Sequence, residues 1–225
     1  MVVARGCRGE FLETWRGVTL GGVGLGAAAG RVVEIKLFSK ELTGGFPAEL
    51  GQLAALTCLN LQDNRLTGPV PSALGKFVVL TRLFLGSNQL TGRMPADLGK
   101  LTALEVLHMG RNWLTGEVPA VLGQLTRLRY LRLEPNQLTG RLPPELGLLT
   151  TLKELHLDDN RLVGALPAAL GQLAMLEKLQ LSNNQLTSAP ATFTQLAALE
   201  SVDLLYNLLT SLPTAPRGLL DRRRR

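Results

Sequence analysis

The feature that most constrains this chain is a run of seven asparagines at a nearly fixed interval. Each follows an apolar residue by three places and precedes a leucine by two. They recur every 24 residues, with a last interval of 23, and comprise Asn64, Asn88, Asn112, Asn136, Asn160, Asn184 and Asn207. A fixed period in this range indicates one supersecondary unit that is stacked many times and buries its apolar face against its neighbours. The chain is therefore predicted to be a solenoid rather than a globule.

Aligned on the asparagine, the copies share the pattern L-x-x-L-x-L-x-x-N-x-L-T-G-x-φ-P-x-x-L-G-x-L-x-x, in which φ is apolar. The alternating L-x-L segment predicts a short strand with inward leucines, and its return in every copy predicts a parallel sheet. The segment from Pro to Gly predicts a short helical turn. Because helical segments are wider than strands, the sheet is expected on the concave side. The asparagines are expected to pair with the backbone of the turn and of the next repeat.

This pattern resembles the leucine-rich repeat family, and in particular its plant-type subclass, which is marked by L-T-G-x-φ-P. The block with its glycine occurs six times, at Gly44, Gly68, Gly92, Gly116, Gly140 and Gly164. The resemblance implies an α/β fold, a right-handed curved solenoid with a parallel concave sheet and short helical or 3-10 turns on the convex side. It also implies a second strand on one flank, at Phe46, Val70, Met94, Val118, Leu142 and Leu166. The copies at Asn184 and Asn207 lack the glycine, which leaves that strand open there.

The extent of the repeats divides the chain into three segments. About eight copies occupy residues 32–213, and the first has Lys40 in place of the asparagine. Residues 1–31 form a cap-like segment, in which Trp15 and Gly17 resemble the start of the family's amino-terminal cap and a Gly-rich hairpin follows. The glycines of that hairpin could also suggest a dinucleotide-binding loop, but the residues after them continue as a strand and not as a helix. Residues 214–225 form a short basic tail.

Charge and composition argue against several classes of partner. Of the net charge of +6, four charges belong to the terminal run Arg222 to Arg225, so a nucleic-acid partner is not expected. The longest uncharged stretch, residues 17–30, is too short and too rich in glycine for membrane insertion. The first ten residues do not read as a signal peptide, and Cys7 and Cys58 do not suggest a bridge. We therefore expect a cytoplasmic monomer, with an extracellular location open if the amino terminus is incomplete.

Functional residues are expected among the outward strand positions, because the repeat itself does not require them. Their side chains form columns across the sheet, with neighbours about 4.8 Å apart. One aromatic–basic cluster lies in the middle of this grid and comprises Phe84, Val106, His108, Tyr130, Arg132 and His156. Such a composition is typical of a binding hot spot. Trp113 is expected to extend this surface at its rim, Gly86 and Gly110 to leave room for a ligand, and Glu134, Asp158 and Asp159 to form an acidic flank.

The most favoured function is protein or peptide recognition on the concave face, in signalling or defence. The resemblance implies roles like those of receptor-kinase ectodomains and polygalacturonase-inhibiting proteins. Two alternatives remain: a recognition segment of a larger signalling enzyme, such as a receptor-like kinase or GTPase, and a nucleic-acid or membrane-surface binder that acts through the Arg tail.

Neither catalysis nor a cofactor is expected from the residues. His108 and His156 lie two strands apart with Arg132 between them, which argues against a metal site. The carboxylates Glu154, Asp158 and Asp159 are expected on an open sheet without the burial that would raise a pKa. Cys58 is expected to face outward as an ordinary solvated thiol.

Overall fold

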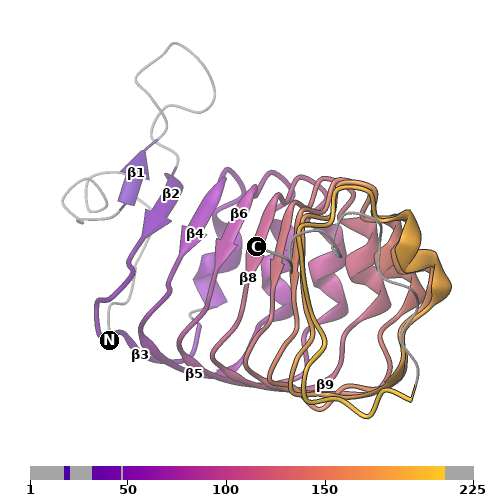
Figure 1. Ribbon diagram of the computed structural model, residues 1–225. Helices are drawn as coiled ribbons and strands as arrows, with labels where there is room; N and C mark the ends of the chain where they lie inside the picture. Colours follow the sequence, from indigo (N-terminus) through magenta and orange to yellow (C-terminus); the bar gives the residue numbers. More distant parts are fainter. Residues whose placement is uncertain (1–17, 21–31, 47, 211–225) are drawn as a thin grey trace.

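The computed structural model describes residues 18–20, 32–46 and 48–210. Within them, a short strand recurs in each of the eight repeats, and a second short strand and a 3-10 turn follow it in the first seven. The repeats stack side by side (Figure 1). The predicted cap residues Trp15 and Gly17, the glycine-rich hairpin, Cys7 and the basic tail lie outside the described residues.

The principal sheet has nine strands in chain order, one from each repeat and one from the segment before them. The strands are β1 (Val18–Leu20), β2 (Val32–Lys36), β4 (Cys58–Asn60), β6 (Arg82–Phe84), β8 (Val106–His108), β10 (Tyr130–Arg132), β12 (Glu154–His156), β14 (Lys178–Gln180) and β16 (Ser201–Asp203). β1 pairs antiparallel with β2, and all later neighbours pair in parallel. The predicted parallel sheet is confirmed. Its outward side, the predicted concave side, is called the sheet face below.

The opposite side of each of the first seven repeats carries a 3-10 turn, as the Pro-to-Gly spacing predicts (Figure 1). The turns are η2 (Ala48–Gln52), η3 (Ser72–Lys76), η4 (Ala96–Lys100), η5 (Ala120–Gln124), η6 (Pro144–Leu148), η7 (Ala168–Gln172) and η8 (Ala191–Gln195). A proline precedes six of them in an extended conformation, for example Pro119 before η5. Proline favours this position because its fixed φ suits the start of a helical turn and no amide donor is lost.

The flanking strands exist, but they begin earlier in the repeat than the resemblance implies. They are β3 (Thr43–Gly44), β5 (Arg65–Pro69), β7 (Gln89–Gly92), β9 (Trp113–Glu117) and β11 (Gln137–Thr139) in one sheet, and β13 (Val163–Ala165) and β15 (Gln185–Ser188) in another. The expected residues Phe46, Val70, Met94, Val118, Leu142 and Leu166 lie outside these strands.

The shift has a physical reason in the glycine of each block. Gly68 and Gly116 lie inside β5 and β9, one residue before the strand ends, and their φ angles of 80° and 78° bend the chain there. The apolar residues that follow then point into the core, where Val70 and Val118 are buried. β15 shows that the strand also forms in the Asn184 copy, which lacks this glycine. In the Asn207 copy, β16 is followed by no flanking strand as far as residue 210, where the description ends.

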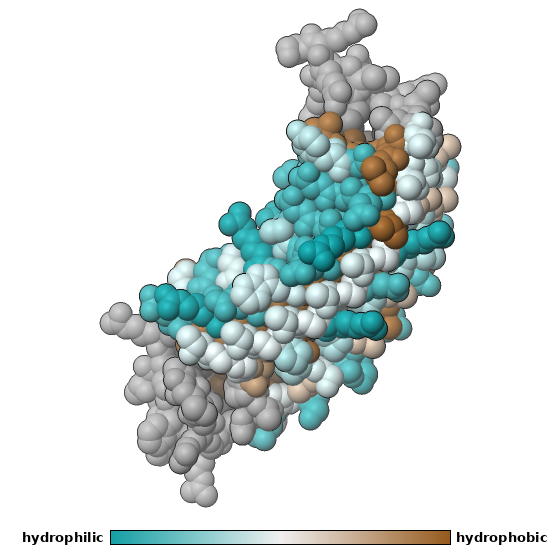
Figure 2. Space-filling model, turned by 90° about the horizontal axis from the view of Figure 1, so that it is seen from below, coloured by the Kyte–Doolittle hydropathy of each residue, from teal (hydrophilic) through white to brown (hydrophobic). Residues whose placement is uncertain are grey.

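Figure 2 shows the flank of the stack from below. Hydrophilic and neutral residues cover most of it, and hydrophobic residues show only in small separate patches. The leucines of the repeats account for this, because nearly all of them lie in one continuous core between the sheet and the turns. Leu83, Leu107 and Leu131, the central residues of three adjacent strands, are completely buried.

The asparagines tie neighbouring repeats together. Asn112 donates from Nδ2 to the carbonyls of Leu85 and Met109, both at 3.0 Å, and its Oδ1 accepts from the amide of Leu90 at 3.0 Å. Two of these three partners belong to the preceding repeat, so the expectation that the asparagine reaches the next repeat is wrong. The first repeat has Lys40 in place of the asparagine. Its backbone is tied to the second repeat by Asn64, whose Oδ1 accepts from the amide of Lys40 at 3.0 Å.

Candidate functional site

The register of the sheet brings eight of the nine predicted site residues onto the sheet face. Phe84, His108, Arg132 and His156 lie opposite one another on successive strands from β6 to β12. Val106 and Tyr130 form the row beside them. Glu134 and Asp158 follow two residues after β10 and β12, so they continue the same grid past the strand ends.

The aromatic–basic cluster is more enclosed than a column of outward residues suggests. All six of its members are half-buried rather than exposed. Phe84 and His108 pack edge to face, with ring centroids 6.5 Å apart and an angle of 85° between the planes. Such pairs hold both rings in a defined orientation. The cluster is therefore a shaped surface and not a set of free side chains.

The two glycines beside the cluster do not leave open space, which corrects the expectation. An added Cβ at Gly86 would lie 2.8 Å from Nε2 of His108, so the imidazole already covers this position. An added Cβ at Gly110 would lie 2.0 Å from the carbonyl oxygen of Glu134. Both glycines are buried. They are needed for close packing of the neighbouring repeat and not for approach of a ligand.

Trp113 lies apart from the other predicted residues. It opens β9 in the five-stranded flanking sheet, and its side chain is 51 % exposed. The sequence places it one residue after Asn112, where the chain leaves the sheet face for the flank. It offers a separate aromatic contact and does not belong to the cluster.

Glu154 is an important residue of the face that the sequence analysis did not assign to the site. It occupies an outward position on β12 yet is buried, because Arg132 donates to its Oε2 at 2.6 Å and Lys178 donates to its Oε1 at 3.0 Å. These hydrogen bonds and charges lower the pKa of the Glu154 carboxyl, although burial alone would raise it. A signal was present, since the register places Glu154 beside Lys178 and one row from Arg132.

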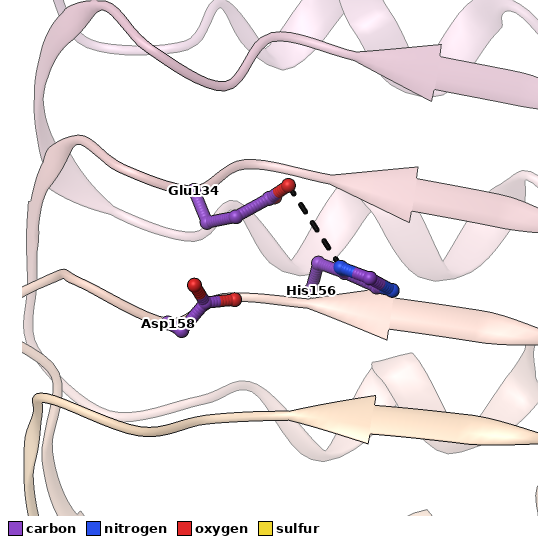
Figure 3. A group of neighbouring side chains, drawn as sticks. All are labelled: Glu134, His156 and Asp158. Atoms are coloured by element: carbon purple, nitrogen blue, oxygen red, sulfur yellow. Dashed lines mark ion pairs between the residues drawn. The ribbon is translucent and has the colours of Figure 1, made fainter. Parts of the chain in front are cut away.

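Glu134, His156 and Asp158 meet at the carboxyl ends of β10 and β12. His156 Nδ1 lies 3.8 Å from Glu134 Oε1, and both side chains are less than one-fifth exposed (Figure 3). Burial raises the pKa of Glu134 to about 7, and the nearby Asp158 charge adds to this. Burial also raises the pKa of Asp158. The expectation of carboxylates without burial is therefore wrong for Glu154, which is buried, and for Asp158, which is half-buried.

The two histidines share a lowered pKa but not a site. Burial is the main cause for each, and the Arg132 guanidinium between them adds to it. His108 contacts Phe84, whereas His156 faces Glu134. At neutral pH both imidazoles are favoured in the neutral form, which can accept as well as donate.

Cys58 is buried and does not face outward as an accessible thiol. Glu34 and Arg82 flank it on β2 and β6, and their side chains join at 3.0 Å. Burial is the main reason that the pKa of the thiol is raised, so the reactive thiolate is disfavoured.

No helix within residues 18–20, 32–46 and 48–210 has the length and apolar character needed to cross a membrane.

The chain matches models of the leucine rich repeat family over much of its length. The matched residues are 55–77, 79–101, 127–149 and 150–215, which together make up more than half of the chain. None of the curated proteins compared with the chain matches it.

Several solved structures are similar. One is the ectodomain of the plant membrane receptor kinase GASSHO1/SCHENGEN3 from Arabidopsis thaliana in complex with CASPARIAN STRIP INTEGRITY FACTOR 2, with 35 % identity, a TM-score of 0.79, and coverage of 92 % of this chain and 27 % of that one. A second is the Arabidopsis receptor kinase HAESA in complex with the peptide hormone IDA and the co-receptor SERK1, with 34 % identity, a TM-score of 0.71, and coverage of 75 % and 29 %.

A third similar structure is bacterial. It is the leucine-rich repeat protein LIC12759 of Leptospira interrogans, with 39 % identity, a TM-score of 0.67, and coverage of 76 % of this chain and 42 % of that one. This chain thus spans less than half the length of each of the three structures. The repeat pattern, the sheet with its 3-10 turns, the family models and these structures agree, and the chain belongs to the leucine-rich repeat family, with repeats of the plant type.

Proposed function

We propose that this chain is a non-catalytic recognition scaffold that binds a peptide or an extended segment of a protein on its sheet face. The contact surface is the aromatic–basic cluster, centred on Phe84, His108, Tyr130 and Arg132. The single observation that carries this proposal is the packed arrangement of aromatic and basic side chains on adjacent strands, where the repeat requires none of them.

The fixed positions of these side chains favour tight binding. The Phe84 ring packs against His108, and Glu154 holds the Arg132 guanidinium at 2.6 Å. A surface that is already ordered loses little conformational entropy when a ligand binds. Aromatic residues and arginine also contribute more than other types to the binding energy of interfaces.

The similar receptor structures support a peptide as the ligand. HAESA was solved with a peptide hormone, and the GASSHO1/SCHENGEN3 ectodomain with CASPARIAN STRIP INTEGRITY FACTOR 2. These likenesses favour an extracellular setting over the cytoplasmic one expected from the sequence. They also favour the alternative in which the chain represents the recognition segment of a larger receptor-like protein, and a full-length transcript that continues into a kinase domain would establish it.

The proposal is tested with a displayed library of random peptides selected on the folded chain. Affinities of the selected peptides are then measured by calorimetry for the parent and for two variants. The double variant Phe84→Ala, Tyr130→Ala removes two aromatic groups from the sheet face and is expected to weaken binding at least roughly tenfold, or about 1.4 kcal/mol. Trp113→Ala is the matched control, because it removes an exposed aromatic group from the flanking sheet.

Three outcomes would contradict the proposal. The first is a selection that yields no peptide with saturable binding. The second is equal affinity for the parent and the double variant, and the third is a loss of affinity that occurs only with Trp113→Ala. Circular dichroism of each variant verifies that the repeat structure is intact.

A further inference from the structure

Three side chains from two adjacent repeats converge at one point of the sheet face. Glu134 follows β10, and Asp158 follows β12 at the equivalent position one repeat later. His156 ends β12 and projects to the same side as Asp158, because the two are separated by one residue on an extended chain. One ligand atom from each of the three residues lies within 4.8 Å of the others (Figure 3).

These three side chains hold buried polar atoms that lack partners. Within the described part of the chain, the buried side-chain atoms without a hydrogen bond are Glu134 Oε2, His156 Nε2 and Asp158 Oδ1. The side chains of Glu134 and His156 are 17 % and 18 % exposed. Buried polar atoms in folded proteins are almost always paired, and a group without partners calls for an explanation such as an ion. All three atoms belong to side chains of this cluster, but His156 Nε2 lies on the side of the ring that faces Glu154. The two carboxylate oxygens are therefore the unpaired atoms that an ion bound between the three side chains would explain.

The cluster has the donor set of a metal centre. A neutral imidazole nitrogen and two carboxylates bind divalent ions of the first transition row, and zinc accepts both kinds of ligand. The lowered pKa of His156 leaves its nitrogens free of an extra proton at neutral pH. A cation would also offset the unfavourable burial that raises the pKa of Glu134 to about 7.

A third carboxylate, that of Glu154, lies on the opposite side of the His156 ring. His156 Nδ1 faces Glu134, whereas Nε2 on the far side of the ring lies 3.4 Å from Glu154 Oε2. Glu154 is itself fixed by Arg132 and Lys178. Histidine ligands commonly direct their second nitrogen at a carboxylate, which sets the ring orientation and makes the ligand more basic. Glu154 lies close enough to Nε2 for this role, although the two atoms do not form a hydrogen bond in this structure.

We propose that Glu134, His156 and Asp158 form a binding site for a divalent transition-metal ion, with zinc as the best fit. His156 binds through Nδ1, and each carboxylate supplies one oxygen. Two atoms bound to the same zinc lie at most about 4.2 Å apart, so the ion draws the three side chains slightly closer. Calcium and magnesium fit less well because they prefer sites built from oxygen alone. Three protein ligands leave a fourth position for water or for a donor atom of a partner.

The experiment is a titration of the untagged, chelator-treated chain with zinc chloride by calorimetry and with cobalt chloride by visible absorption. All variants carry Cys7→Ser, so that this thiol cannot bind the metal. Saturable binding of one ion per chain is expected. His156→Gln and Asp158→Asn are each expected to weaken it by at least about 100-fold, and Glu154→Gln by about tenfold. His108→Gln is the matched control and is expected to leave binding unchanged.

Nuclear magnetic resonance provides a test that needs no ligand variant. The chain contains two histidines, so His108→Gln assigns both sets of imidazole signals. Zinc is expected to shift the ring signals of His156 and to leave those of His108 in place. The proposal is overturned if the chain binds neither ion saturably, if His156→Gln binds as tightly as the parent, or if His108 responds instead. It stands apart from the proposed peptide binding, which these measurements do not involve.

Discussion

The repeated asparagines from Asn64 to Asn207, called the asparagine ladder below, and the Glu134–His156–Asp158 cluster both bury polar side chains. They differ in whether the buried polar atoms have hydrogen-bond partners. Asn112 uses its amide nitrogen and oxygen in bonds to four backbone groups. The cluster, on the sheet face, leaves one buried atom of each of its three residues without a hydrogen-bond partner. The ladder recurs in every repeat with an asparagine, whereas the cluster occurs once among the described residues. A polar group that the fold requires is paired within the fold, so the unpaired ones point to something the fold does not supply.

The largest expected loss of stability comes from removing one asparagine of the ladder. Asn112→Ala leaves the buried amide of Leu90 without a partner and removes one donor from each of the Leu85 and Met109 carbonyls. These carbonyls still accept from Asn88 and Asn136, so the expected destabilisation of the chain is roughly 3 kcal/mol. Asn60→Ala removes one accepted bond on the strand surface and is expected to lose only about 1 kcal/mol. Urea unfolding followed by circular dichroism measures both. Equal losses would mean that the ladder is not the principal polar support.

Gly110→Ala tests whether close backbone packing holds the cluster in place. Its Cβ would lie 2.0 Å from the carbonyl oxygen of Glu134, so the backbone must move, at an expected loss of about 2–3 kcal/mol. Gly86→Ala meets the imidazole of His108, which can rotate away, and a smaller loss is expected. Thermal unfolding distinguishes the two variants. A Gly86→Ala variant as unstable as Gly110→Ala would show that the imidazole is as confined as the backbone.

Glu134→Gln tests whether the buried carboxylate of the cluster destabilises the metal-free chain. At pH 8 and with a chelator present, the parent holds a charged carboxylate that burial disfavours, because its pKa is about 7 against 4.5 for the free group. Removing the charge is expected to stabilise the metal-free chain, by about 1–3 kcal/mol. Glu145→Gln, at an exposed position on η6, is the control and should change stability by less than about 0.5 kcal/mol. Destabilisation by Glu134→Gln would assign the carboxylate a structural role like that of the asparagines.

The smallest effect is a pH dependence that His108 contributes. Burial and the charges of Arg132, Arg111 and His156 lower its pKa below 6.5, against a raising effect of Asp63. The unfolded chain therefore takes up this proton first as the pH falls. Stability is fully present above pH 6.5 and decreases as the pH drops from 6.5 towards the folded-state pKa. His108→Gln should flatten this part of the stability curve, as measured by urea unfolding between pH 7.5 and 5.

Much of the fold could be predicted from the sequence because the period makes each residue's place explicit. The sheet strands, the helical turns and the pairing of the asparagines with the backbone all follow from positions that recur. The repeat to which each asparagine reaches was mispredicted, because its partners lie in the preceding repeat. The flanking strands were misplaced because the apolar residue of each block, such as Val70, packs into the core, and the backbone angle at Gly68 bends the strand one residue before its end. The pattern of letters does not contain that angle.

The site was less predictable, because burial on the sheet face depends on contacts between columns. Cys58 is enclosed by an ion pair between residues of the repeats on either side of it. His156 was compared with His108 along one column, whereas its actual neighbours, Glu134 and Asp158, lie in the next column. A comparison of each outward residue with those in the neighbouring column, in its own repeat and in the adjacent one, would have predicted that these three residues are neighbours. The orientation of each side chain would still have required the structure.

The 24-residue repeat makes the metal-ligand arrangement transferable. A histidine and an aspartate two residues apart in one repeat, with a glutamate one period before the aspartate, define the whole cluster. Any two adjacent repeats of this solenoid offer the same backbone positions. The arrangement could therefore arise, disappear or move along the chain by three substitutions, without an insertion or a change of fold, and related proteins could carry it at different heights of the stack.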